Sequence, residues 1–411
     1  MKKFNILCAF MGVAIALCSC NKEDNVIKST ANKAITETNY RIVDIDQAKS
    51  MAEKLVQMMG ESKAIMGDDA DATRFKISSV EPYITNGITT MYFINFGNNN
   101  GYMILSADKE ASSSMIAFNP KGHLSVSGLE KETGVNQQFL KLGKTIAEEL
   151  NSGVDKSNPK YELWDAMGKN ANEDIEIGIR RIEETDISAP GIRARHKGSY
   201  GLEEITPYYM VKDYVWGPGE GYNADAKVKD ALLGPAVNIG LLCISNRFPK
   251  KYPYHEMFKD VTTMWTNSVS KMLRDIADQI PNFKWNKENY SKASYEDILA
   301  CLISLGYKDA KLGEYDLHLY HKNVKKKHPV LLAGRDERGT HVWIADGYYE
   351  GKAEFFSRSR HTARIIHRWY EYVDMIFINW GLNGESNQWF SHDRIPYFKQ
   401  DRKIFYDLDP S

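Results

Sequence analysis

Several residues of this chain carry groups that could take part in covalent catalysis. Cys243 and Cys301 have thiols, His341 begins an apolar strand-like run, and Asn379 and Trp380 end another such run. Catalysis by a thiol needs a histidine that shares the thiol's proton and a third group that orients the imidazole ring. On neighbouring strands, His341 and Asn379 would supply these two groups. The nucleophile is expected at the beginning of a helix, where the helix dipole stabilises a thiolate.

The helix that would hold this nucleophile begins near Gly234 and Pro235, where glycine suits the N-cap and proline the first helical position. Proline has neither a nucleophilic group nor a backbone N–H. Cys243 lies about 12 Å further along the helix axis, at about 1.5 Å per residue. This separation exceeds hydrogen-bond reach of a base placed for position 235. We therefore expect Cys243, and Cys301 in another apolar helix, to be buried free thiols rather than a disulfide.

Other chemical groups give weaker patterns. Ser245, Ser268 and Ser270 have no catalytic motif around them. His318 and His321 could pair on one face of a helix as metal ligands, but no cysteine or carboxylate spacing completes a zinc site. We therefore expect surface histidines here, and neither a metal nor a cofactor.

Three segments of the C-terminal half resemble the streptopain family of papain-like cysteine peptidases. They are a glycine-rich loop that leads toward the central helix, a strand with a Thr-His-Val-Trp core and an Asn-Trp-Gly segment, at residues 216–223, 339–348 and 378–384. The resemblance implies that His341 is the catalytic histidine and that Asn379 and Trp380 orient and shield it. Two positions depart from the family: Pro235 replaces the nucleophilic cysteine, and Pro218 replaces the glutamine of the oxyanion hole.

These departures change the function that the resemblance implies. Without the nucleophile covalent catalysis is abolished, and loss of an oxyanion donor alone typically costs about 10²–10³ in rate. The chain is thus expected to be a pseudopeptidase in which His341, Asn379 and Trp380 form a vestigial site. The alternative interpretation of His341 is an ordinary strand residue whose ring is satisfied by Asn379 or by a backbone carbonyl.

The N-terminal half has its own pattern. A helix should follow Asp44 and end near Gly60, and strand-like runs cover residues 74–80, 89–96, 102–106 and 115–118, with a hairpin turn at 98–101. An aromatic strand, a short turn and a glycine-led strand that ends in Ser-x-Asp resemble the inhibitory pro-domain of the streptopain family. A generic hairpin is the alternative.

The C-terminal half places helices before strands. Helical stripes cover residues 261–280 and 294–305, and strand-like runs cover 329–333, 341–345 and 375–380. The expected fold class is therefore α+β, with a papain-like cysteine peptidase fold preceded by a small helix-plus-antiparallel-sheet pro-domain.

The N-terminus resembles a lipoprotein signal. Two lysines precede an apolar run too short to span a membrane, and Leu-Cys-Ser-Cys ends at Cys20. The resemblance implies cleavage before Cys20 and lipidation of its thiol. The Asn-Lys-Glu-Asp that follows is similar to the acidic signal that directs lipoproteins of Bacteroides-like bacteria to the cell surface. We therefore expect an outer membrane lipoprotein, with simple secretion as the alternative.

The expected organisation is a signal peptide (1–19), a tether (20–43), a pro-domain (44–128), a helical and irregular connector (129–205) and a papain-like domain (206–411). The connector carries a basic cluster at 193–197, which suits either maturation cleavage in a zymogen or a solvated linker.

The expected function follows from these parts. A formal net charge of -1 gives no reason to expect nucleic acid as a partner. The leading hypothesis is a surface-anchored lipoprotein without peptidase activity, whose former substrate cleft binds a peptide, a protein partner or its own pro-domain. It would meet the membrane only through its lipid. An active secreted cysteine endopeptidase made as a zymogen is the alternative, and a structural or adhesive module is a third class.

Overall fold

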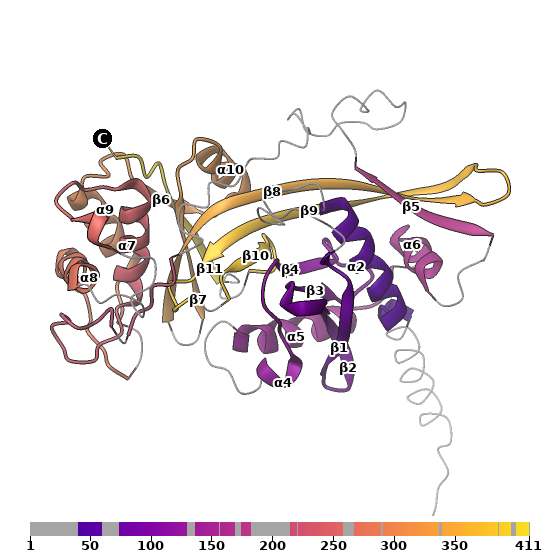
Figure 1. Cartoon of the computed structure of the whole chain (residues 1–411), viewed down its shortest axis with the longest axis horizontal. Helices are drawn as coiled ribbons and strands as arrows, with labels where there is room; N and C mark the ends of the chain where they lie inside the picture. The colour runs from indigo at the N-terminus through magenta and orange to yellow at the C-terminus, as the bar shows by residue number, and fades with distance from the viewer. Residues whose placement is uncertain are drawn as a thin grey trace, which may run out of the picture.

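The computed structural model describes residues 40–59, 74–129, 136–155, 157–168, 174–181, 214–219, 221–257, 267–288, 291–336, 339–384, 386–395 and 400–410. These residues form one antiparallel sheet of 11 strands with helices packed against it, which confirms the α+β class. Along the sheet the strands follow the order β1-β2-β3-β4-β10-β9-β8-β7-β11-β6, and β5 pairs with β8. The helices α7, α8 and α9 lie at one end, and α2 and α6 lie beneath the far part of a long hairpin (Figure 1).

The N-terminal elements match the sequence prediction closely. Helix α2 (Ile45–Met59) begins after Asp44, whose carboxylate accepts the Gln47 N–H at 2.8 Å, while the Gln47 side chain accepts the Asp44 N–H. The strands are β1 (Ile77–Thr85), β2 (Ile88–Phe96), β3 (Tyr102–Ser106) and β4 (Met115–Asn119). The main difference is that β1 is longer than expected, because Asn86 and Gly87 with positive φ close a tight hairpin with β2.

The turn between β2 and β3 depends on Gly101. Asn98 and Asn99 have φ near 60° in the short 3₁₀ segment η2 (Gly97–Asn99), and Gly101 has φ of +104°. A Cβ atom at Gly101 would lie 2.1 Å from the Asn119 carbonyl oxygen. Glycine is therefore required both by the backbone conformation and by the close approach of β4.

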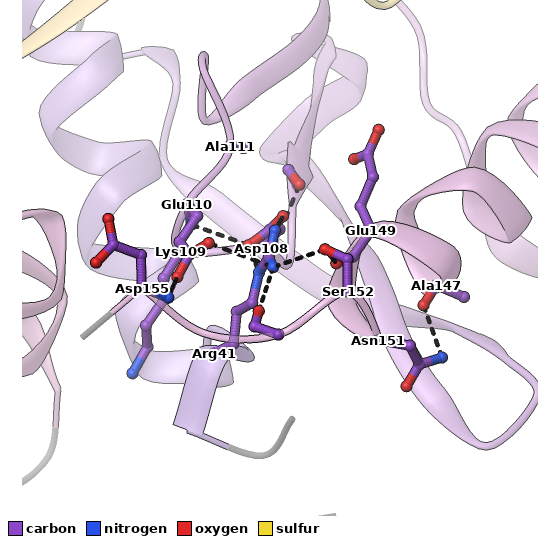
Figure 2. Close-up of polar contacts among 12 residues, drawn as sticks. Arg41, Asp108, Lys109, Glu110, Ala111, Ala147, Glu149, Asn151, Ser152 and Asp155 are labelled. Carbon is purple, nitrogen blue, oxygen red and sulfur yellow. Dashed lines mark hydrogen bonds and ion pairs between the residues drawn. The ribbon is translucent and has the colours of Figure 1, made fainter. Parts of the chain in front are cut away.

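A buried ion pair joins the beginning of the described chain to this sheet. The Arg41 guanidinium donates from Nε and Nη2 to the two carboxylate oxygens of Asp108 at 2.7 and 2.6 Å, and from Nη1 to the Gly153 carbonyl at 2.6 Å (Figure 2). Glu110 lies 3.3 Å from the same Nη1. This bidentate geometry is the strong form of an arginine–carboxylate pair. Together with the bond to Gly153, it fixes the end of helix α5 against the β3–β4 connection.

The expected connector is more ordered than predicted. Helix α4 (Val126–Leu129) is followed by α5 (Asn136–Leu150), which packs on β1 and β2, and by α6 (Lys160–Met167), which packs beside α2. Strand β5 (Ile175–Arg181) then pairs with β8, a pairing that the sequence pattern did not reveal. The basic cluster at 193–197 lies outside the described residues.

The helices of the C-terminal half are α7 (Gly234–Asn246), α8 (Asn267–Gln279), α9 (Tyr295–Leu305) and α10 (Leu317–Lys325), with the short 3₁₀ segment η4 (Tyr254–Glu256). Ser294 caps α9 by accepting the Asp297 N–H, and Gly306 ends it in the left-handed conformation. The first part of the helical stripe at 261–280 lies outside the described residues. Helices α7, α8 and α9 share one buried core.

The strands of the C-terminal half are β6 (Lys311–Glu314), β7 (Val330–Asp336), β8 (Gly339–Ser359), β9 (Ile365–Asn379), β10 (Gln388–Ser391) and β11 (Gln400–Tyr406). The two expected strands at 341–345 and 375–380 are the inner ends of the long β8–β9 hairpin, which reaches from the α7 end across α2 (Figure 1). Strands β6, β10 and β11 were not expected as strands.

The sheets of the two halves are continuous. Strand β4 pairs with β10, with Phe118 opposite Trp389 and Ala117 opposite Phe390. The expected pro-domain and the expected papain-like domain therefore share one sheet. Among the described residues, no helix is long and apolar enough to cross a bilayer, and the expected signal peptide and Cys20 lie outside them.

Candidate functional site

A small pocket of about 60 Å³ lies where the beginning of α7 meets the inner ends of β8 and β9. It gathers residues from several distant segments: Gly234, Pro235, Asn238, Ser291, Thr340, His341, Val342, Trp343, Trp380 and Leu382. The structure thus brings together three of the residues that the sequence singled out, namely Pro235, His341 and Trp380. Apart from the histidine, none of the lining side chains is ionisable.

Pro235 lies in the first turn of α7, at the N-terminus of the helix. The helix begins one residue earlier than the sequence suggested, because Leu233 rather than Gly234 is the N-cap residue. The cap makes no side-chain hydrogen bond, and Pro235 has no N–H to donate. The half-buried proline ring therefore contributes an apolar surface where a polar group would meet the helix dipole.

Pro218 is buried beside this helix but is not among the pocket-lining residues. Its carbonyl accepts the Leu233 N–H at 2.8 Å, which fixes the loop at 214–219 to the residue that precedes α7. Pro218 thus contributes a backbone acceptor and no side-chain donor to this region.

His341 lies in the first part of β8, opposite Gly334 of β7, and is half-buried at the pocket. Two residues further, Trp343 is fully buried, and its ring centroid lies 5.1 Å from that of Trp380. The two tryptophan rings thus form an aromatic part of the pocket wall that His341 also lines.

Asn379 is fully buried at the inner end of β9, opposite Ile344 of β8. Its side-chain amide donates to the Tyr214 carbonyl at 2.8 Å and its Oδ1 accepts the Gly381 N–H at 2.9 Å. These contacts hold the loop at 214–219 and the turn after β9 together. Asn379 is not among the pocket-lining residues.

Trp380 is held from both its backbone and its ring. Its N–H donates to Asn387 Oδ1 at 3.0 Å, and its indole N–H donates to the Ser386 carbonyl at 3.0 Å. The ring also contacts Phe390 edge-on, at a centroid distance of 5.6 Å. These contacts fix the position of the Trp380 ring in the pocket wall.

Asn238 is a pocket residue that the sequence reasoning missed. It is 2% exposed and lies on α7 one turn after Pro235. Its Oδ1 accepts the Ile344 N–H at 3.2 Å, and its Nδ2 donates to the carbonyls of Gly234 at 3.2 Å and Trp380 at 3.4 Å. A polar residue within the otherwise apolar start of the helix was the available signal, since a buried amide needs partners.

The described thiols are inaccessible, as the sequence predicts. Cys243 and Cys301 are free and fully buried in the core of α7, α8 and α9. Burial raises the pKa of Cys301 to about 12 and that of Cys243 still further above its ordinary value. A thiol that stays protonated is a poor nucleophile.

The two histidines on α10 differ from each other. His318 is exposed as expected, whereas His321 is half-buried, with its ring centroid 3.5 Å from that of Tyr348, and is thus less exposed than expected. Burial lowers the pKa of His321 to about 3, because the charged ring would lose its hydration. Within the described part of the chain, no group of three or more histidine, cysteine or acidic residues is arranged to hold a metal ion.

Comparison with known proteins identifies one part of the chain. Residues 33–145 match a family model described as Spi protease inhibitor, the pro-domain of streptopain-type peptidases. No curated protein matches the chain. The matched segment contains α2 and the strands β1 to β4, which is the region where the sequence showed the pro-domain pattern. Residues 33–145 are therefore similar to a protease-inhibitor pro-domain, which suggests a peptidase-related protein.

Proposed function

We propose that this protein is a peptidase-related binding protein in which the pocket between α7 and β8 binds a peptide or protein ligand without cleaving it. In this proposal the C-terminal half has a papain-like scaffold, and His341, Asn379 and Trp380 are the remains of a catalytic site. The observation that carries the proposal is that Pro235 and His341 line the same pocket. In this proposal His341 is the former base, and a proline ring stands where the thiol of a peptidase would be.

The chemistry of the pocket suggests the class of ligand. Its walls include Val342, Trp343, Trp380 and Leu382, with Asn238, Ser291, Thr340 and His341 as the polar groups. Mostly apolar walls with a few fixed polar groups are typical of sites that take an uncharged group and orient it by hydrogen bonds. We propose that a small apolar side chain of an extended peptide enters this pocket.

The alternative function, an active cysteine peptidase, needs a reactive thiol. The two free cysteines of the described chain are fully buried, and the pKa of each thiol is raised. Neither Cys243 nor Cys301 is among the pocket-lining residues. These observations favour binding over catalysis.

The proposal is tested by restoring the missing nucleophile. The variant Pro235→Cys, with Pro218→Gln added in a second protein, is treated with an epoxide inhibitor of papain-like enzymes, and mass spectrometry locates the adduct. We expect no adduct in the native protein and a single adduct at position 235 in the variants. The neighbouring imidazole and the helix dipole lower the pKa of a thiol placed there.

A matched control distinguishes activation of the new thiol by His341 from simple accessibility of that thiol to the inhibitor. Pro235→Cys combined with His341→Ala keeps the new thiol but removes the base, so we expect its labelling at pH 6 to be about tenfold slower or more. Equal labelling with and without His341 would contradict a vestigial thiol–imidazole site. Labelling of native Cys243 or Cys301 would instead support the active peptidase.

We further propose that the protein is attached to the outer membrane by lipid on Cys20 and displayed at the cell surface. The support is the sequence of the N-terminus, where an apolar run ends in Leu-Cys-Ser-Cys. Expression of Cys20→Ser should move the protein from the detergent phase to the aqueous phase of a phase-separation assay. An unchanged partition would refute the anchor.

A further inference from the structure

We propose that the N-terminal half of this protein (described residues 40–181) is a permanent structural part that stays bound when the segment after it is cut. This differs from the expectation of a pro-domain that is released on maturation. The proposal is independent of the ligand in the pocket, because it concerns a different surface of the C-terminal half (described residues 214–410).

The first observation is that two of the three buried cores are shared between the halves. In one, Phe139 of α5 stacks on Phe390 of β10 at a ring-centroid distance of 6.2 Å, together with Met91, Phe93, Trp343 and Ile378. In the other, α2 and α6 cover the apolar face of the long hairpin, which includes Tyr349, Phe355, Trp369, Val373 and Met375. Removal of the N-terminal half would expose both faces to water, and apolar patches of that extent are rare on soluble monomers.

The second observation is a buried charge with partners across the boundary. Glu371 of β9 is 1% exposed, and its carboxylate accepts the Ser114 N–H at 2.6 Å and lies 3.2 Å from Lys160 Nζ. Lys160 in turn donates to the Ala111 carbonyl at 2.7 Å. Both partners of Glu371 come from the N-terminal half. Glu371 therefore favours the state in which the two halves are bound to each other, because a buried charge without partners destabilises the protein.

The third observation is strand pairing at two separate places. At one, β4 is hydrogen-bonded to β10. At the other, β5 pairs along seven residues with the outer part of β8, from Ile175 opposite Ser359 to Arg181 opposite Ala353. The ion pair Arg394–Glu149, at 2.9 Å, lies between α5 and the turn after β10. Because contacts are made at both ends of the hairpin, the two halves can dissociate only when all of these contacts open together.

The position of the pocket means that a ligand can bind without release of the N-terminal half. All of its lining residues come from positions 234–382, and none comes from the described part of the N-terminal half. An inhibitory pro-domain works by covering the site, whereas the contacts described here lie along the sheet and the hairpin. The two halves therefore behave as one folded unit.

The first test uses the soluble chain from residue 21, with a site-specific protease sequence inserted between Gly191 and Ile192. The folded protein is cut and passed through a size-exclusion column without denaturant, and a form in which the two pieces are co-expressed as separate chains provides the cut state directly. We expect the two pieces in equal amounts in one peak at the mass of the uncut protein. A folded C-terminal piece that elutes alone overturns the proposal.

A second test uses the uncut protein, so that it does not depend on the folding of either piece. Phe139→Ala removes a ring of the shared core, and Ile276→Ala removes a side chain of similar burial from the core that contains only α7, α8, α9 and other C-terminal residues. Hydrogen exchange of the β10 amides should become about tenfold faster in Phe139→Ala than in Ile276→Ala. Faster exchange confined to the N-terminal half in Phe139→Ala would overturn the proposal.

Discussion

Replacement of Asn238 by alanine tests whether this amide positions the pocket walls. The substitution removes the acceptor of the Ile344 N–H, at 3.2 Å, and the donor to the Trp380 carbonyl, at 3.4 Å. Ile344 is fully buried and Trp380 is 4% exposed, so water cannot readily replace these partners. A buried polar group left without a partner costs about 1–3 kcal/mol, and the longer bond to Trp380 lies at the lower end.

The expected loss of stability follows from these contributions. The two lost partners cost about 2–4 kcal/mol together, and the better helix propensity of alanine returns about 0.5–0.7 kcal/mol. A net loss of about 1.3–3.5 kcal/mol lowers the melting temperature by about 1.5–4 °C in a chain of 411 residues, because the unfolding entropy grows with chain length. Differential scanning calorimetry measures the shift, and near-ultraviolet circular dichroism reports the packing of Trp343 and Trp380.

The matched control is Asn246→Ala at the other end of the same helix. Asn246 is half-buried, and its amide reaches the Tyr307 hydroxyl only at 3.5 Å. We expect this variant to lose less than about 1 kcal/mol and to keep the tryptophan signal. If Asn238→Ala lowers the melting temperature no more than Asn246→Ala, the view of Asn238 as the residue that joins α7, β8 and the turn after β9 is refuted.

Three further outcomes are expected. Gly101→Ala should cost several kcal/mol, on the order of 3–5, because its Cβ would meet backbone, whereas Gly122→Ala, with open space around it, should cost about 1 kcal/mol in thermal unfolding. Burial raises the pKa of Asp374 to about 7, so the contribution of this carboxyl to stability should fall as pH rises from about 4 to 7. Asp374→Asn should therefore gain about 1–3 kcal/mol at pH 8 but little at pH 4, measured by urea unfolding. Iodoacetamide at pH 8 should modify Cys243 and Cys301 only after denaturation; labelling of folded protein would contradict their burial.

Local sequence signals predicted much of the N-terminal half. The cap at Asp44, the Asn-rich turn before Gly101 and the alternating strands are all encoded within a few residues of each other. The shared sheet could not be predicted in this way. The pairing of β4 with β10 joins residues that are far apart in sequence, and the short segment Gln388–Ser391 is fully buried and shows no alternation.

In the candidate site, too, residues in recognisable segments were predicted and residues gathered by tertiary contacts were not. Pro235 and His341 could be assigned to one site because the segments around them resemble those of the streptopain family. Ser291 and Thr340 could not be assigned, because the pocket gathers them through tertiary contacts and their own neighbourhoods carry no motif. The long hairpin beyond Ala345 was not predicted either, because its apolar residues are buried through tertiary contacts with α2 and α6.

The pairing of β4 with β10 also prevents self-association of the protein through open strand edges. Each of these strands would be an open edge in a separated half, with unpaired N–H and C=O groups that can pair with another chain. In the described sheet, the edge of β10, with its sequence Gln-Trp-Phe-Ser, is covered by β4, and the ends of the strand order are β1 and β6. A preparation of the C-terminal half alone would present an apolar, unguarded edge strand and would self-associate through it.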